Sequence, residues 1–181
     1  MPTPSENRTV IALALPDEAA TEALAASLSP LLCGRRKGID VGGRIHLRGD
    51  LGAGKTSFAR AFLRASGIQG RIKSPSYALL ESYNLSRLNF YHLDFYRFSD
   101  SHEWLDAGFR DILQEHAIVL IEWPEQAGDL LPPPDLDIRI EHEDEGRSAV
   151  LTAYSDKGSL WLTTLFPAKA TPRPPTPAGD A

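Results

Sequence analysis

A chain of 181 residues with 42% apolar and 24% charged residues has the composition of a single globular domain. No apolar run approaches the roughly 18 residues of a membrane-spanning helix, and a net charge of −5 gives no support to a protein that binds nucleic acid on its own. The first residues lack the basic and then apolar order of a signal peptide, and the single cysteine, Cys33, excludes an internal disulfide. We therefore expect a cytoplasmic protein.

The N-terminal half begins with a predicted apolar strand over residues 9–15. A helix is expected next, between Pro16 and Gly34, because it starts with acidic residues and its leucines then recur at helical spacing. Residues 44–48 are predicted to form a second strand, which leads directly into a glycine-rich segment. Helical periodicity resumes over residues 55–66 and ends before a glycine.

The rest of the domain alternates strands with short helical pieces. In chain order we expect strands at 77–85 and 88–94, helical pieces at 101–107 and 109–115, a strand at 117–121, and a hairpin of 136–143 with 147–154. The strand at 117–121 is apolar throughout, as strands covered on both faces are. The pattern predicts an α/β, P-loop NTPase-like three-layer fold with a central, mostly parallel sheet and an antiparallel hairpin at its edge.

Three segments divide the chain. Residues 1–7 are predicted to be a flexible N-terminus, and residues 8–166 to form the domain. Residues 167–181 contain five of the fourteen prolines and almost no large apolar side chain. Such a segment buries too little surface to offset the entropy of ordering, so we predict a disordered, proline-rich tail.

The glycine-rich segment has the spacing of a phosphate-binding loop. The pattern G-x-x-x-x-G-K-T spans Gly49–Thr56, between a predicted strand and a predicted helix, which is the context that this loop requires. Lys55 is predicted to reach the β- and γ-phosphates, and Thr56 to offer its hydroxyl to Mg²⁺. The residues predicted to bind ATP are Asp50, Leu51, Gly52, Ala53, Gly54, Lys55, Thr56 and Ser57.

A magnesium site of this kind needs a carboxylate at the end of a neighbouring buried strand. The apolar run 117–121 ends at Glu122, the predicted metal residue; the alternative is a strand that ends in a solvated glutamate. His92 and Asp94 share one strand face that would approach the phosphates, although a satisfied histidine and a capping aspartate are the simpler interpretation on composition alone. Ser76 is a weak candidate for sensing Mg²⁺ or the γ-phosphate.

Several segments together resemble one family, the bacterial TsaE (YjeE) proteins of tRNA threonylcarbamoyladenosine biosynthesis. The matching segments are GDLGAGKTSF (49–58), SPSY (74–77), HLDFYR (92–97), a stretch over 103–108, IEWPE (121–125) and LP (131–132). They cover about residues 43–132. The phosphate loop is shared in part with other proteins, but its combination with H-x-D-x-Y-R and I-E-W-P-E is highly specific.

The resemblance implies an ATPase that acts with the TsaB–TsaD complex. That complex modifies the adenosine next to the anticodon in tRNAs that read codons beginning with A. ATP and Mg²⁺ would be the cofactors, and tRNA would be reached only through the complex, with no membrane involved.

The resemblance also carries site residues over to this sequence. Lys55 and Thr56 match the family's phosphate and magnesium residues, and Glu122 matches its metal-site acid. Asp94 matches the acid implicated in hydrolysis. Ser76 stands where the family usually has Thr, so the hydroxyl and its switch role are kept. The predicted catalytic residues are therefore Asp94, Lys55 and Ser76, and the predicted metal residues are Thr56 and Glu122.

Other classes share the phosphate loop. A small-molecule P-loop kinase, the leading alternative, would typically add an arginine-rich lid, and no such cluster follows the core helices. A GTPase would need an N-K-x-D guanine-binding motif, which is absent from the sequence. A non-hydrolysing adaptor would bind ATP only as a structural ligand, and Glu122 and Asp94 argue weakly against it.

Overall fold

The computed structural model describes residues 8–114 and 116–169. In chain order its elements are β1 (Val10–Leu15), α1 (Glu18–Leu32), β2 (Gly43–Arg48), α2 (Lys55–Ser66), β3 (Leu80–Leu85), β4 (Leu88–Asp94), α3 (Glu103–Asp106), α4 (Arg110–Gln114), β5 (Ala117–Glu122), the 3₁₀ helix η1 (Pro124–Leu130), β6 (Leu136–His142), β7 (Arg147–Ala153) and α5 (Asp156–Leu165). Within these residues, no helix has the length and apolar character needed to cross a membrane. The predicted N-terminal segment 1–7 and most of the predicted tail lie outside the described residues.

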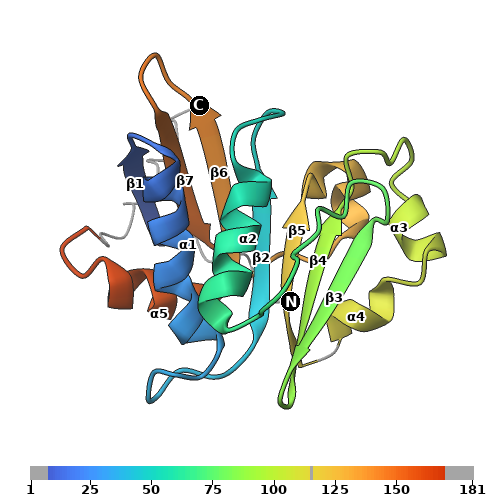
Figure 1. Ribbon diagram of the computed structural model, residues 1–181, viewed down its shortest axis with the longest axis horizontal. Coiled ribbons are helices and arrows are strands. Elements are labelled where there is room, and N and C mark those ends of the chain that lie inside the picture. The colour runs from blue at the N-terminus through green and yellow to red at the C-terminus, as the bar shows by residue number, and fades with distance from the viewer. Residues whose placement is uncertain (1–7, 115, 170–181) are drawn as a thin grey trace, which may run out of the picture.

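Seven strands form one mixed sheet, in the order β1-β7-β6-β2-β5-β4-β3 (Figure 1). The four central strands are parallel, since β2 pairs with β5 and β6, and β5 pairs with β4. Both edges are antiparallel: β6, β7 and β1 follow one another on one side, and β3 pairs with β4 on the other. The predicted α/β class, parallel centre and edge hairpin are confirmed.

Two apolar clusters cover opposite faces of the sheet and make the three layers. Alternation along β5 sends Ile118 and Leu120 to the cluster under α1 and α2, and Val119 and Ile121 to the other cluster. Trp104 and the apolar residues of α3 and α4 pack on that second face (Figure 1). Every residue of β5 is buried, which explains why its sequence is apolar without interruption.

The helix boundaries have local causes. The Asp17 side chain caps α1 by accepting a hydrogen bond of 2.8 Å from the Ala20 N–H. Helix α2 begins after Gly54 and ends at Gly67, both in the left-handed region. Helix α5 was not predicted, and it starts at Ser155, whose hydroxyl accepts a bond from Gly158 N–H at 3.1 Å.

Strand β3 differs from its prediction. It begins at Leu80 rather than at residue 77, because residues 75–78 form a turn and Leu79 has a φ of 66°. Leu79 N–H closes this turn by donating to Pro75 O at 2.7 Å. The turn matters for the site, since it holds Ser76 beside the end of β4.

Candidate nucleotide-binding site

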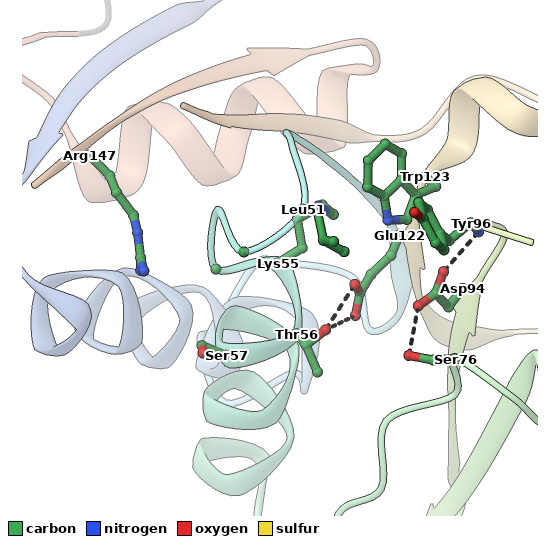
Figure 2. A pocket seen from close by; sticks show the side chains of 12 residues that line it. Leu51, Lys55, Thr56, Ser57, Ser76, Asp94, Tyr96, Glu122, Trp123 and Arg147 are labelled. Atoms are coloured by element: carbon green, nitrogen blue, oxygen red, sulfur yellow. Dashed lines mark hydrogen bonds between the residues drawn. The ribbon is translucent and has the colours of Figure 1, made fainter. Parts of the chain in front are cut away.

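The candidate site lies where three neighbouring parallel strands end. Strand β2 runs into the glycine-rich loop, β4 ends at Asp94, and β5 ends at Glu122. The register pairs Asp94 with Glu122, and Glu122 with Leu47 of β2. The carboxyl ends of parallel strands are where open α/β sheets bind ligands. A pocket of about 200 Å³ occupies this position (Figure 2).

The loop geometry requires glycine at two positions. Gly54, at the start of α2, has a φ of 113°, which disfavours any residue with a Cβ. A Cβ at Gly49 would collide with the backbone oxygen of Ile140 on β6. The loop can therefore lie close to β6 and lead into the N-terminus of α2, where free N–H groups and the helix dipole favour an anion.

Lys55 points back over the loop that precedes it. Its Nζ donates to the carbonyl oxygens of Gly49 and Asp50 at 2.6 and 2.9 Å, and it lies 4.2 Å from the centre of the Trp123 ring. Burial lowers the pKa of Lys55, and the carboxylate of Glu122 opposes this most strongly among the nearby acids. The ammonium is thus a poorly hydrated cation that a phosphate would stabilise.

Thr56 and Glu122 are brought together from 66 positions apart. The Thr56 hydroxyl lies 3.0 Å from each carboxylate oxygen of Glu122. His92 supports the same carboxylate, with Nε2 2.8 Å from Glu122 Oε1. His92 and Glu122 are almost fully buried, so Glu122 is held in position rather than solvated. The alternative of a solvated strand end is therefore wrong.

The chemistry of this pair fits Mg²⁺. A hydroxyl and a carboxylate are the hard oxygen ligands that this ion prefers, and phosphates and water usually complete its shell. No group of three or more His, Cys, Asp or Glu side chains within the described residues could hold a metal by protein ligands alone. A Mg²⁺ site in which nucleotide phosphates supply the missing oxygen ligands is consistent with this lack of a complete set of protein ligands.

Asp94 faces the pocket from the end of β4. Its carboxylate accepts from Tyr96 N–H at 2.9 Å and from the Ser76 hydroxyl at 3.3 Å, and Ser76 in turn lies 2.7 Å from the Ser74 hydroxyl. Burial raises the pKa of Asp94, and the Glu122 carboxylate adds to this, whereas the Tyr96 and Ser76 hydrogen bonds lower it. Asp94 lines the same pocket as the phosphate loop, and it also accepts from Tyr96 N–H as a capping aspartate would, so its approach to the phosphates stays a prediction.

The structure brings most of the predicted site residues together. Those that line the pocket are Leu51, Gly52, Gly54, Lys55, Thr56, Ser57, Ser76, Asp94 and Glu122. Two others do not: the Asp50 side chain is exposed, and Ala53 is buried in the core under α1 and α2. The loop backbone at these two positions is what could meet a ligand.

Three lining residues were not predicted as site residues: Tyr96, Trp123 and Arg147. Tyr96 and Trp123 have ring centres 5.0 Å apart, and the Trp123 ring lies against the Lys55 ammonium (Figure 2). Both stand inside the matched motifs H-x-D-x-Y-R and I-E-W-P-E, which was a usable signal. Arg147 follows the acidic hairpin turn in no motif, and the sequence gives no signal for it.

Comparison with known proteins places this geometry in a family. The family model described as "Threonylcarbamoyl adenosine biosynthesis protein TsaE" matches residues 15–149. The chain belongs to the TsaE family. The match contains the loop, both acids and Arg147, so the whole candidate site lies within the shared region.

Individual TsaE proteins agree with this assignment. The tRNA threonylcarbamoyladenosine biosynthesis protein TsaE of Haemophilus influenzae is 41% identical over 114 residues, which are 63% of this chain and 72% of that protein. The Bacillus subtilis protein of the same name is 34% identical over 120 residues, 66% of this chain and 75% of that protein. The crystal structure of Bacillus subtilis YdiB superposes with a TM-score of 0.69 at 26% identity, covering 87% of this chain and 95% of YdiB.

Proposed function

We propose that this TsaE-family protein is a Mg²⁺-dependent ATPase that supports threonylcarbamoyladenosine modification of tRNA in the cytoplasm, together with TsaB and TsaD. The modified base is the adenosine next to the anticodon in tRNAs that read codons beginning with A. One observation carries the proposal: the Thr56 hydroxyl, next to Lys55 in the chain, contacts both carboxylate oxygens of Glu122. Asp94 is the register partner of Glu122 on the adjacent strand β4.

Each residue has a role that follows from its position. Lys55 would exchange its two loop carbonyls for β- and γ-phosphate oxygens, because a charged acceptor makes the stronger bond. Thr56 and Glu122 would hold Mg²⁺, which neutralises charge on the phosphates when bound. Asp94 would orient the attacking water and accept its proton, and Ser76 would fix the Asp94 carboxylate.

Partner dependence is part of the proposal. No arginine of the described residues lies beside Asp94 and Glu122 in the pocket, since the one lining arginine, Arg147, lies apart from them in Figure 2. P-loop enzymes that lack such a group commonly gain orders of magnitude in rate when a partner docks. The net charge of −5 also favours access to tRNA through a protein complex rather than directly.

The test is steady-state ATP turnover by the protein alone and with TsaB–TsaD. Turnover is expected to be slow alone and to rise with the partners. Asp94→Ala should lower the stimulated rate by about 10²-fold or more, as loss of a general base does. Lys55→Ala should weaken ATP binding about tenfold to a hundredfold, since a charge-assisted bond contributes roughly 1.5–3 kcal/mol.

Asp111→Ala is a matched control, because Asp111 is an exposed acid on α4, outside the pocket. It should leave turnover unchanged. Fast turnover without partners, or no stimulation by them, would contradict the proposed partnership. Unchanged ATP affinity in Lys55→Ala would contradict the nucleotide site itself.

A further inference from the structure

Arg147 begins β7 and sends its side chain to the phosphate loop from the side opposite Asp94. Its Nη1 lies 2.8 Å from the position that a Cβ at Gly54 would occupy, so the guanidinium rests on the loop backbone. That Nη1 is buried and has no hydrogen-bond partner among the described residues. A buried donor without an acceptor is costly, and most such donors in native proteins are matched by a partner or a ligand.

A second unpartnered group lies beside it. Thr21 of α1 is fully buried, its Oγ1 lacks a partner within the described chain, and its Cγ2 is 3.8 Å from the same Cβ position at Gly54. The Ser57 hydroxyl donates to Glu18 of α1 at 2.8 Å, which holds α1 against the first turn of α2. Three elements therefore meet at Gly54 and leave two polar groups unsatisfied there.

The position of Arg147 relative to Thr56 and Glu122, the predicted Mg²⁺ residues, indicates which part of a bound nucleotide it would contact. Figure 2 shows Thr56, Glu122 and Asp94 on one side of the loop and Arg147 on the other. The β- and γ-phosphates belong with Lys55 and the metal pair, so the α-phosphate and the nucleoside must continue away from them. Arg147 and Lys55 are the two cations among the described pocket residues, and the two lie apart.

We propose that Arg147 binds the α-phosphate of the nucleotide. The guanidinium carries a permanent charge and a planar fork of donors, which suits two phosphate oxygens at once. The closeness of Nη1 to Gly54 places this fork beside the phosphate loop. This inference rests on the proposed nucleotide site and adds to it a residue supplied by the antiparallel edge of the sheet.

The experiment is calorimetric titration of ADP into the full-length protein and three variants. Arg147→Gln is expected to weaken ADP binding about tenfold to a hundredfold, as loss of a charge-assisted bond does. Arg147→Lys keeps the charge without the fork and should fall between Arg147→Gln and the wild type. Arg139→Gln is the matched control, since Arg139 is exposed on the neighbouring strand β6 and does not line the pocket; it should bind ADP normally.

Phosphorus NMR at saturating ADP identifies the phosphate involved. The α-phosphorus resonance of bound ADP should differ between the wild type and Arg147→Lys, whereas the β-phosphorus resonance should stay in place. A change confined to the β-phosphorus would overturn the assignment. Unchanged ADP affinity in both Arg147 variants would overturn the role of Arg147 and leave the nucleotide site intact. Absence of ADP binding by the wild type would instead refute the proposed function, and this inference with it.

Discussion

At the scale of single residues, four buried polar side chains of the site have hydrogen-bond partners within it. Lys55, His92, Asp94 and Glu122 are each less than 5% exposed. Burying a polar or charged group is costly unless it is hydrogen-bonded. Each of the four makes at least one such bond, and His92 makes it through Nε2, while its Nδ1 has no partner among the described residues. Groups held in this way need little rearrangement when charge develops in a reaction, which is the main source of electrostatic catalysis.

Asp94 should set the acidic limb of the pH–rate profile. Asp94 must be deprotonated to accept a proton. Because burial raises its pKa, activity should be lost on acidification at a pH higher than the ordinary aspartate pKa of about 3.9. The Ser76 hydrogen bond lowers this pKa. Ser76→Ala should therefore move the limb to higher pH, as measured by kcat/KM for ATP.

Ser82→Ala is the control for this change in the pH profile, because Ser82 is exposed on β3 and does not line the pocket. Its profile should superpose on that of the wild type. A limb that stays in place in Ser76→Ala, or moves to lower pH, would contradict the role of Asp94 as the titrating base.

Sequence reasoning located the pocket residues whose signal is local and missed those placed by distant strands. Lys55 and Thr56 follow from the loop spacing, and Glu122 from a buried strand that ends in an acid. Arg147 belongs to β7, and only the pairing of β7 with β6 brings it near the loop. No local pattern contains that information.

At the scale of elements, helix α2 and strand β4 have the predicted bounds, because their periodicity and their flanking turns agree. Helix α5 was missed, since Gly158 and two threonines weaken its helical propensity. Tertiary packing supplies the stability instead: Trp161 and Leu162 are fully buried in the core, and a Cβ at Gly158 would collide with Asp135 O.

Strand β2 carries a buried histidine that should make stability depend on pH. His46 is 3% exposed, both of its ring nitrogens lack partners among the described residues, and burial lowers its pKa to about 3, with Arg48 and Arg44 adding to this. The unfolded chain, in which this histidine has a pKa of 6.5, binds the proton first as the pH falls. Stability from the neutral histidine is therefore complete above pH 6.5 and is lost as the pH falls toward 3.

Urea unfolding of the wild type and His46→Leu measures this pH dependence. Between pH 6.5 and pH 5, the stability of the wild type relative to His46→Leu should fall by about 1.6 kcal/mol, because proton uptake by the unfolded chain alone is half complete at pH 6.5 and then costs the folded state up to about 1.4 kcal/mol for each pH unit. Val150→Leu, which changes no titratable group at an exposed position on β7, should alter the stability equally at both pH values. If the difference in unfolding free energy between the wild type and His46→Leu is the same at both pH values, His46 is not held neutral in the folded protein.

At the scale of the whole molecule, the order of the strands decides the site. Strand β5 lies between β2 and β4, although the chain visits them in the order β2, β4, β5. This crossover puts Asp94 and Glu122 side by side at the carboxyl ends of two adjacent parallel strands. The α/β class follows from the alternation of elements, but strand order depends on long-range pairing, which local periodicity does not contain. Loop spacing and the buried strand indicated Glu122, whereas Asp94 was favoured only once the family resemblance was considered.

The last residues of the chain should be dispensable for stability and ATP binding. Helix α5 ends at Leu165, and within residues 8–114 and 116–169 Phe166 is the last apolar side chain that packs against the core under α1 and α2. Deletion of Pro167–Ala181 removes a segment with five prolines and leaves Phe166 in place. We expect the melting temperature and the ATP affinity to stay nearly unchanged, because few native contacts are lost.

A second truncation gives this deletion its control. Removing residues 166–181 also deletes Phe166, so that variant should lose part of the packing under α5 and melt several degrees lower, since about 1 kcal/mol changes the melting temperature of a domain of this size by roughly 2–4 °C. If instead the shorter deletion of Pro167–Ala181 already lowers the melting temperature by several degrees, the tail docks on the domain. The same titrations with ATP would then show whether it docks near the nucleotide site, because a tail that covers the pocket must change the affinity when it is removed.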